Sequence, residues 1–419
     1  MPAELNHREN AHLNSQNMDL TTVEEFFAQG KFEQAEKGFQ SIVEQDKNNF
    51  QAHLQLGRIH LFKNRFTDAE KILRKGLLLQ PGNKDISRLL AQLFYRQDRY
   101  TEALPYYRSI DQLALAKKLE LFEDRIPYEF DDAASITSIP FQQTDPLPVL
   151  KASVNGSEPI NFVIDTGGPE LMLDAQFAKA VGVKAVTSTT GSFAGGKAAP
   201  VEHGLIDSFR IGDFSVGNLP VSLMPVQQFS TPIFGEERPI MGIIGTAFLY
   251  HFLSTLDYPN GQLILAKSTE ENASRLQKRA SQKAAIVVPF WMAGSHFIVA
   301  EGRVNSSPGM LFFVDTGLAG GGFMCSEAVA KKYGVKLMTD QVREGMGAGG
   351  PVKTVPLVVD QLSLGEATES QIPGFVMDLH LDHLGFAIAG IISHAFFRSY
   401  ALTFDFHSMQ LILEKTTIN

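Results

Sequence analysis

The chain has 419 residues, of which 44% are hydrophobic and 20% are charged, so its composition excludes a collagen-like, low-complexity or wholly disordered protein. Its 46 acidic residues outnumber its 37 basic residues, and the formal charge of −9 argues against a nucleic-acid binder that relies on phosphate contacts. The single cysteine, Cys325, excludes an internal disulfide and a multi-cysteine metal site, and we expect it to be a small buried apolar residue. The length suggests two or three domains.

No apolar run reaches the roughly 18 residues that a membrane-spanning helix needs. Residues 1–17 are polar and lack the apolar stretch of a signal peptide. If the chain is complete, we expect it to be cytoplasmic, without a membrane span; if a signal peptide has been removed, it would be periplasmic or secreted.

The N-terminal part of the chain repeats with a period of 34 residues. Three columns of residues follow this period, and between them apolar side chains recur every three or four positions, as in helices. The columns are Phe32, Phe66 and Tyr100; Ala35, Ala69 and Ala103; and Phe39, Leu73 and Tyr107. The pattern over residues 18–122 resembles about three tetratricopeptide repeats, each a helix–turn–helix unit. The alternative is a generic array of helical hairpins.

The rest of the chain contains a second, longer repeat. Residues 154–168 match residues 304–318 at an offset of 150, and later matches follow at an offset of 148. Both copies consist of short runs rich in Val, Ile and Phe that are bounded by Gly, Pro, Asn and Ser, which indicates β-strands. We therefore predict one duplicated β domain, with its copies at residues 135–267 and 284–416.

A few segments of these copies have other properties. Residues 174–181 and 326–333 have helical spacing. The charged segment 268–283 between the copies is interpreted as a solvated connector with a helical turn or two. A junction at residues 124–134 separates the helical repeats from the first copy. The predicted fold class is thus multidomain, α-helical repeats followed by an all-β part with two lobes.

The chemical signal is a pair of Asp-Thr-Gly triplets at equivalent places in the two copies. They begin at Asp165 and Asp315, and each directly follows a run of at least three apolar residues, so each aspartate should leave a buried strand and enter a tight turn. A Gly-Ile-Ile run follows each aspartate at a distance of about 77 residues. A lone triplet would be an ordinary turn, whereas two equivalent triplets indicate a shared site.

This arrangement over residues 136–415 resembles the aspartic proteases, with two retropepsin-like halves fused in one chain as in the pepsin-like arrangement. The resemblance implies that Asp165 and Asp315 form a catalytic pair. Two carboxyl groups about 3 Å apart cannot both ionise, so they share a proton. One then takes a proton from a water while the other donates to the scissile carbonyl, with no covalent intermediate, metal or cofactor.

The resemblance also assigns supporting roles to the residues that follow each aspartate. Thr166 and Thr316 would hydrogen-bond across a two-fold axis and hold the turns rigid. Gly167 and Gly317 would let each backbone approach the carboxyl groups, where a side chain would clash.

Each copy contains a glycine-rich segment that corresponds to the flap, a hairpin that closes over bound peptide in this family. The first spans residues 191–196 and the second residues 345–350. Glycines would permit hinge motion and close approach to a substrate strand. The candidate flap or substrate residues are Phe193, Gly195, Gly196, Met346, Gly349 and Gly350. Each segment has the alternative of being an ordinary mobile loop.

The sequence departs from the family pattern at three places. Gly168 and Leu318 stand where pepsin-like enzymes have a hydroxyl that would lower the pKa of the carboxyl group, so we expect the pair to titrate higher and to work at weakly acidic or neutral pH. Ser393 replaces the glycine found at Gly245, so the packing under the second turn must differ from that under the first.

Other chemistry-bearing residues have simpler interpretations. Asp257 and Asp405 precede hairpin turns and should cap their own backbone. The group His380, Asp382 and His383 lacks recognisable metal-ligand spacing and is explained better by a solvated loop. Trp291, His203, His251 and His296 also carry no ligand pattern, and Trp291 is expected in the core.

The favoured interpretation is an aspartic endopeptidase whose repeat region recruits a protein partner or substrate, restricts access or mediates self-association. Extended peptide would pair with strand and flap edges between the lobes. The alternative from another class is a non-catalytic module that binds peptide in the same groove, and a third is a scaffold that acts through its repeats. The expected partners are a peptide or protein substrate and a protein bound by the repeats.

Overall fold

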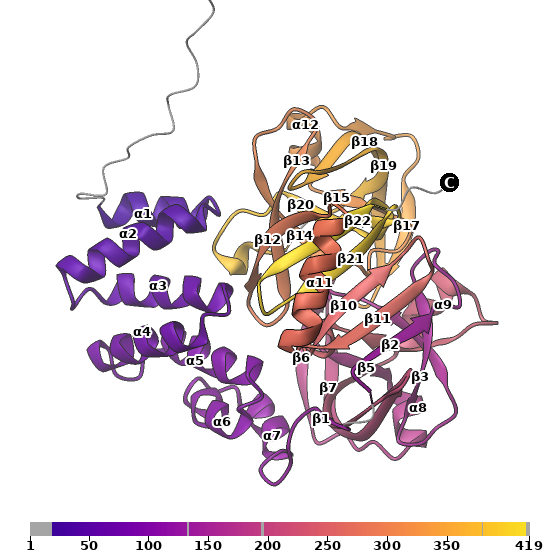
Figure 1. The fold of residues 1–419 in the computed structure, drawn as a ribbon, viewed down its shortest axis with the longest axis horizontal. Coiled ribbons are helices and arrows are strands. Elements are labelled where there is room, and N and C mark those ends of the chain that lie inside the picture. The colour runs from indigo at the N-terminus through magenta and orange to yellow at the C-terminus, as the bar shows by residue number, and fades with distance from the viewer. Residues whose placement is uncertain (1–18, 132–133, 194–196, 379, 416–419) are drawn as a thin grey trace, which may run out of the picture.

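The computed structural model describes residues 19–131, 134–193, 197–378 and 380–415, and it shows a stack of helices beside two β lobes (Figure 1). The helical part follows the predicted period and forms three hairpins and a seventh helix. The helices are α1 (Leu20–Ala28), α2 (Phe32–Gln45), α3 (Phe50–Phe62), α4 (Phe66–Leu79), α5 (Lys84–Arg96), α6 (Tyr100–Ser109) and α7 (Leu113–Glu120). Among the helices of the described residues, none is both long and apolar enough to cross a membrane.

Small residues inside the repeats let the paired helices approach, as the sequence predicts. Ala35, Ala69 and Ala103 are completely buried. A Cβ atom on Gly57 of α3 would lie 2.6 Å from the Leu73 side chain of α4, so this close packing needs glycine.

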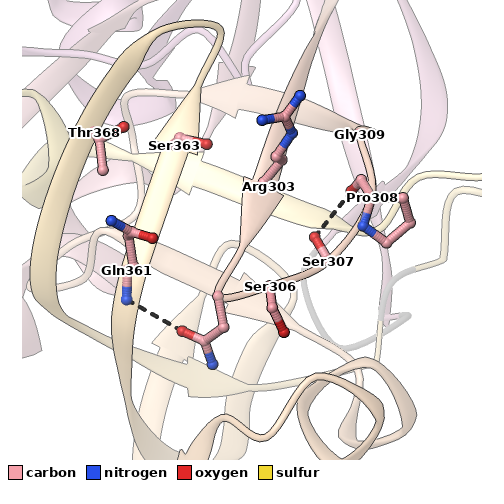
Figure 2. Close-up of a pocket in the computed structure, with 9 residues that line it drawn as sticks. Arg303, Ser306, Ser307, Pro308, Gly309, Gln361, Ser363 and Thr368 are labelled. Atoms are coloured by element: carbon pink, nitrogen blue, oxygen red, sulfur yellow. Dashed lines mark hydrogen bonds between the residues drawn. The ribbon is translucent and has the colours of Figure 1, made fainter. Parts of the chain in front are cut away.

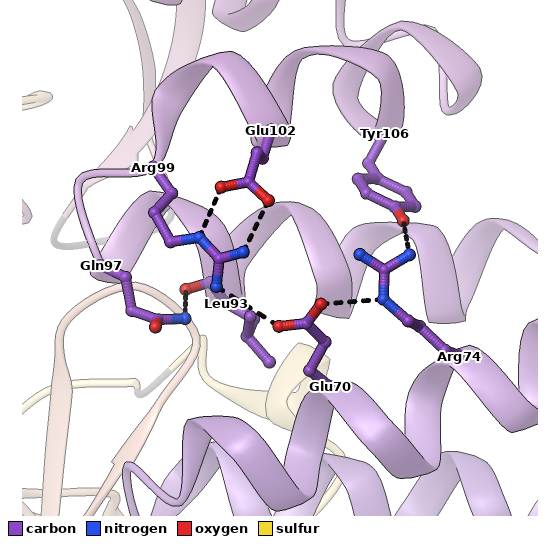
Figure 3. Close-up of polar contacts among 7 residues, drawn as sticks. All are labelled: Glu70, Arg74, Leu93, Gln97, Arg99, Glu102 and Tyr106. Atoms are coloured by element: carbon purple, nitrogen blue, oxygen red, sulfur yellow. Dashed lines mark hydrogen bonds and ion pairs between the residues drawn. The ribbon is translucent and has the colours of Figure 1, made fainter.

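The second helix of each hairpin turns a polar face to solvent. The carboxylate of Glu70 in α4 accepts from the guanidinium groups of Arg74, at 2.8 Å, and of Arg99, at 3.3 Å (Figure 3). Arg99 also pairs with Glu102 at 2.6 Å. Because these groups are partly exposed, each pair contributes little to stability, and the network belongs wholly to the repeat domain.

The first lobe is a sheet with the strand order β1-β8-β5-β9-β4-β3-β7-β6. Its strands are β1 (Glu129–Phe130), β3 (Val149–Val154), β4 (Ile160–Ile164), β5 (Leu171–Asp174), β6 (Thr187–Phe193), β7 (Lys197–Ile211), β8 (Phe214–Met224) and β9 (Ile240–Ile244). Its helices are α8 (Ala175–Ala180), α9 (Val226–Phe234) and α10 (Thr246–Leu249).

The second lobe has the equivalent elements. They are β13 (Phe297–Val304), β14 (Met310–Asp315), β15 (Phe323–Cys325), β16 (Lys336–Leu337), β17 (Arg343–Gly347), β18 (Gly350–Leu364), β19 (Ala367–Val376), β20 (Gly390–Ser393), α12 (Glu327–Lys332), α13 (His394–Phe397) and the 3₁₀ helix Asp382–Leu384. Cys325 is buried in β15, as expected.

The pairing pattern confirms the predicted duplication. In the first lobe β4 pairs antiparallel with β3 and parallel with β9, while β5 pairs antiparallel with β9 and parallel with β8. The second lobe repeats this with β14, β13, β20, β15 and β19 in the corresponding places. The helices predicted at 174–181 and 326–333 are also present, as α8 and α12.

A central run of strands joins the lobes in the order β12-β22-β21-β10-β11-β2. The strands are β2 (Ile136–Pro140), β10 (Phe252–Asp257), β11 (Gln262–Lys267), β12 (Ile286–Ala293), β21 (Tyr400–Asp405) and β22 (Gln410–Lys415). At its middle Thr255 pairs with Thr403, and their buried hydroxyl oxygens are 2.7 Å apart. These threonines are equivalent in the two copies, so a pseudo-two-fold axis passes between them.

The connector between the lobes is more ordered than the sequence analysis predicts. It forms the helix α11 (Glu270–Gln282), which lies over the central strands (Figure 1). Leu276 and Ala280, one helical turn apart, are buried against Leu253 and Ile412. This apolar stripe holds the helix in place, and the charged residues of the segment cover its outer face.

The repeat domain docks on the β lobes through the same edge of each unit. The turns within the three hairpins carry Gly30, Asn64 and Asp98, which are spaced by 34 residues and all have positive φ. Gly30 approaches the second lobe so closely that a Cβ atom would clash. The Asn64 amide donates to the Phe406 carbonyl at 2.9 Å, and the Asp98 carboxylate lies 2.8 Å from Nε2 of His251.

An aromatic cluster closes one end of this interface. The Phe386 ring of the second lobe has centroid distances of 6.0 Å to Phe27, 4.9 Å to Phe32 and 5.8 Å to Phe62. Trp291 packs edge-to-face on Phe32 at 5.4 Å. Trp291 is therefore half-buried and packs against an apolar core cluster that the repeat domain and the second lobe share.

A buried polar cluster closes the other end. The ammonium of Lys118 in α7 pairs with the carboxylate of Glu170 in the first lobe, and both side chains are at most 4% exposed. Glu170 also accepts hydrogen bonds from Tyr95, at 3.0 Å, and from Ser222, and His203 lies 3.7 Å away. Burial alone would raise the pKa of Glu170, but the charge of Lys118 lowers it below the ordinary range.

We expect Lys118→Met to destabilise the chain by about 3–5 kcal/mol, because it leaves the Glu170 carboxylate buried without its cation. Urea unfolding at neutral pH measures the loss. The matched control is Lys118→Met combined with Glu170→Gln, which removes both charges and should recover much of the stability. A single substitution that costs less than about 1 kcal/mol would show that the pair is not needed.

Candidate active site

The two Asp-Thr-Gly turns leave equivalent strands. Asp165 follows β4, and its N–H donates to the carbonyl of Ile244 in β9 at 3.0 Å. Asp315 ends β14, opposite Ser393 of β20. In both lobes the aspartate thus emerges where two parallel strands end together, with buried Val and Ile residues behind it.

The turns of the two lobes face each other at close range. A Cβ atom on Gly167 would lie 2.6 Å from Oδ2 of Asp315, and one on Gly317 would lie closer still to the carboxyl group of Asp165. Glycine is required at both positions because each turn backbone contacts the opposite carboxyl group. The sequence alone suggested this role only through the family resemblance.

Four hydrogen bonds between the threonines lock the turns together. The Thr166 N–H donates to Oγ1 of Thr316 at 3.1 Å, and the Thr316 N–H donates to Oγ1 of Thr166 at 3.0 Å. Each hydroxyl in turn donates to a carbonyl of the opposite strand, that of Val314 at 2.9 Å and that of Ile164 at 3.2 Å. Both threonines are completely buried, and the N–H and hydroxyl groups of each are hydrogen-bonded across the interface of the two turns.

The two carboxyl groups are coupled, and the pKa values of both are raised. The N–H groups of Gly167 and Gly317 donate to Oδ1 of Asp165 and of Asp315, each at 2.8 Å. The carboxyl groups also hydrogen-bond to each other. Burial raises the pKa of Asp165, and burial together with the negative charge of Asp165 raises the pKa of Asp315 well above its ordinary value. The pair therefore holds a proton at pH values where isolated aspartates would be ionised.

Ser393, which stands in place of glycine in the second lobe, has a supporting role that the sequence analysis missed. In the first lobe the Gly168 N–H donates directly to the Asp165 carbonyl at 3.1 Å. In the second lobe the Ser393 hydroxyl donates to the Asp315 carbonyl and accepts from the Leu318 N–H at 3.3 Å. The serine side chain thus bridges two ends of the second turn and supports it.

The next residue also differs between the lobes. Thr246 donates through Oγ1 to the Thr166 carbonyl at 2.8 Å. Its equivalent, His394, is completely buried, and its Nε2 lies 3.2 Å from Oδ1 of Asp145. Burial lowers the pKa of His394. No motif in the sequence marks this histidine, because its partner lies 249 residues earlier in the chain.

A second histidine that the sequence analysis left without a role lies beside the first turn. The imidazole of His296, in the turn between β12 and β13, lies within hydrogen-bonding reach of the Gly167 backbone. Its Nδ1 is 2.9 Å from the hydroxyl of Ser295. Burial lowers the pKa of His296 to about 4, so the ring is neutral over most of the pH range.

The predicted flap residues fall on two hairpins. Phe193 ends β6, and the second hairpin carries Met346 in β17, Gly349 in its turn and Gly350 at the start of β18. Phe193 and Ala348, from opposite lobes, pack against the same apolar cluster of the first lobe. Gly195 and Gly196 lie outside the described residues. Whether these residues contact substrate stays a prediction.

The remaining candidates behave as structural residues. Asp257 accepts from the Asn260 N–H at 3.2 Å, and Asp405 accepts from the His407 and Ser408 N–H groups at 3.0 Å, so both cap their turns as expected. Across the parts of the chain that the structure describes, no group of three acidic, histidine or cysteine residues is placed to hold a metal ion.

Two pockets lie elsewhere on the lobes, and neither includes a predicted site residue in its lining. One, of about 390 Å³, is a polar hollow on the second lobe around Arg303, Asn305 and Gln361 (Figure 2). The other, of about 650 Å³, lies beside Asp174, whose carboxylate already caps the backbone of α8 and α9. Their polar groups are held by local turns, such as Asn305 Oδ1 accepting from the Gln361 N–H at 3.1 Å.

Comparison with protein families agrees with this architecture. Residues 150–248 and 300–393 each match the aspartyl protease family model, and residues 26–93 match a tetratricopeptide repeat model. The chain therefore carries two aspartyl-protease halves behind a tetratricopeptide repeat region, which confirms the resemblance inferred from its motifs. A comparison with curated proteins gave no match.

Asp315→Asn should stabilise the folded chain near neutral pH, by on the order of 1 kcal/mol. A carboxyl group whose pKa is raised on folding binds more protons in the folded state, so it loses stability as pH rises through that pKa. Removal of the charge relieves this loss, and the difference from the native chain should shrink as pH falls towards 4. Unfolding midpoints measured across this pH range test it, and a gain that is independent of pH would contradict the coupling.

Proposed function

We propose that the chain is an aspartic endopeptidase in which Asp165 and Asp315 activate a water molecule for attack on a peptide bond. The observation that carries the proposal is the reciprocal contact of the two turns, in which each glycine borders the opposite carboxyl group and the threonines bond across the axis. A turn with a purely structural role would not need this geometry. It brings two carboxyl groups together against their mutual repulsion, which is a cost that catalysis by an acid–base pair explains.

The mechanism follows from a pair that shares one proton. The ionised carboxylate accepts a proton from water as the oxygen attacks the scissile carbonyl carbon, and the protonated partner donates to the carbonyl oxygen. The tetrahedral intermediate then collapses: its carbon–nitrogen bond breaks, the leaving nitrogen takes up a proton from the pair, and a hydroxyl group of the intermediate returns a proton to the pair as the carbonyl re-forms. The aspartates titrate as a unit, so the starting proton belongs to the pair. Their partial exposure supports access by water.

Substrate would bind as an extended strand against the two hairpins. Backbone pairing would give affinity, and alternate side chains would meet the lobes. The apolar cluster of the first lobe near Phe193 and that of the second lobe near Phe313 and Met324 favour apolar side chains on both sides of the cleaved bond. The repeat domain would add contacts to a protein partner or substrate.

Asp165→Asn and Asp315→Asn should each lower peptide cleavage by roughly a thousandfold or more, because each removes half of the acid–base pair. Cleavage of a mixed peptide library, followed by mass spectrometry, gives the measurement. Asp360→Asn, an exposed aspartate of the second lobe, is the matched control and should cleave like the native chain.

Binding of a statine-type transition-state mimic separates the two classes of function. One-to-one binding together with cleavage supports the enzyme. Binding of peptides by the native chain without cleavage would instead favour the non-catalytic peptide-binding module, and equal cleavage by the native and both substituted chains would end the proposal.

Gly168→Ser should move the acidic limb of the pH–rate profile to lower pH. A Cβ atom at this position lies 3.9 Å from Oδ2 of Asp165, so a serine hydroxyl can donate to the carboxylate and lower its pKa. The methyl group of Met172, 2.7 Å from the same Cβ, must move aside. Gly168→Ala imposes the same displacement without a hydroxyl and is the control. Equal profiles for the two variants, or a native optimum near pH 2, would contradict the argument.

A further inference from the structure

Two arginines of the repeat domain lie at its contact with the second lobe. Arg96, at the end of α5, is 6% exposed, and Arg58 in α3 is half-buried, with its guanidinium over the rings of Phe27 and Phe62 at 4.8 and 5.5 Å. Neither forms an ion pair with a carboxylate of the described residues. Burial lowers the pKa of each arginine to about 10. Because burying a cation is costly, such groups persist where their hydrogen bonds hold something specific.

Both arginines bind backbone carbonyls of the second lobe. Arg96 donates to the carbonyls of Met292, at 2.6 Å, and of Gly294, while its other nitrogen binds Leu61 and Asn64 of the repeats. It therefore fixes the turn 293–297 between β12 and β13. Phe297, at the end of this turn, packs on Phe313 of β14, two residues before Asp315, with ring centroids 5.1 Å apart.

Arg58 holds the other loop of the second lobe. It donates to the carbonyl of Leu384, and the Ala387 N–H donates to the carbonyl of Ala28 at 2.8 Å. These bonds, with the aromatic cluster around Phe386, fix residues 381–388 between β19 and β20. Leu381 and Ile388, at the two ends of this segment, pack on the cluster of Phe313, Met324 and Ile391, directly behind Asp315.

The two loops also meet each other. The Phe297 ring lies 4.1 Å from that of His296, 5.8 Å from that of His383 and 5.1 Å from that of Phe313. The first catalytic turn has its own direct link, since Glu170, two residues beyond Gly168, is paired with Lys118 of α7. The repeat domain thus reaches both catalytic turns through contiguous contacts.

We propose that Arg96 and Arg58 are positioning residues through which the repeat domain takes part in catalysis. Arg96 holds turn 293–297 and Arg58 holds segment 381–388. These two segments in turn hold the facing Asp-Thr-Gly turns in place. This proposal rests on the proposed peptidase function. It gives the repeats a role within the chain itself.

The test compares Arg96→Met and Arg96→Lys in the full chain. Arg99→Met is the matched control, because Arg99 lies only three residues on but pairs solely with Glu70 and Glu102 of the repeats (Figure 3). Arg96→Met should lower kcat by roughly tenfold to a hundredfold with KM within about threefold, as expected when reacting groups are misplaced but the binding surface is intact. Arg96→Lys, which keeps one donor, should recover part of the loss.

Amide hydrogen exchange provides a readout that does not depend on activity. In Arg96→Met, exchange should accelerate at residues 292–297 and also at 166–168, whereas Arg99→Met should leave both segments unchanged. If exchange behaves so but no variant or native chain cleaves peptide, the peptidase function fails while the positioning role stands. If Arg96→Met lowers only the melting temperature, with kcat, pH profile and exchange at 166–168 like those of the control, the positioning role is overturned.

Discussion

The structure depends on holding two half-buried carboxyl groups against each other. Desolvation raises the pKa of Asp165, and desolvation together with the charge of Asp165 raises that of Asp315, so the charged pair opposes folding. What opposes this cost is a set of contacts made by their neighbours: the threonine lock, the glycine N–H donors and the strands that end beneath each turn. The central sheet joins the lobes on the same axis, at the hydroxyl pair of Thr255 and Thr403.

The two lobes are symmetric at the Asp-Thr-Gly turns and differ in the residues that support these turns. The threonine bonds and the glycine N–H bonds to the carboxyl groups are the same in both turns, but the supporting residues differ, since Ser393 takes the place of Gly245 and His394 that of Thr246. Glu170, bound to the repeat domain, has Gly320 as its counterpart in the second copy. Two halves on one chain can diverge in this way, because a substitution in one need not be accepted by the other.

Much of the architecture is predictable from the sequence because it is periodic. Residues that recur at a fixed spacing occupy equivalent positions in the fold, and this can be recognised without knowledge of tertiary contacts. Examples are the column of Ala35, Ala69 and Ala103, spaced by 34 residues, and the two Asp-Thr-Gly triplets, spaced by 150. The features that were missed have no period. The connector was expected to be mostly solvated, although Leu276 and Ala280 form an apolar stripe, and the sequence does not show that Trp291 packs on Phe32 of the repeat domain. Both depend on surfaces that exist only after the domains are assembled.

The same reasoning explains why the docking of the repeats could not be foreseen. Gly30, Asn64 and Asp98 occupy one column of the repeat, yet each meets a different chemical partner on the lobes. The three helical hairpins thus contact different parts of the β lobes by varying the side chain at this one position. The backbone of the turn has positive φ in all three hairpins. The column looks like ordinary turn chemistry in the sequence. The role of this column becomes visible only from the residues that it contacts on the lobes, which are up to 342 residues away along the chain.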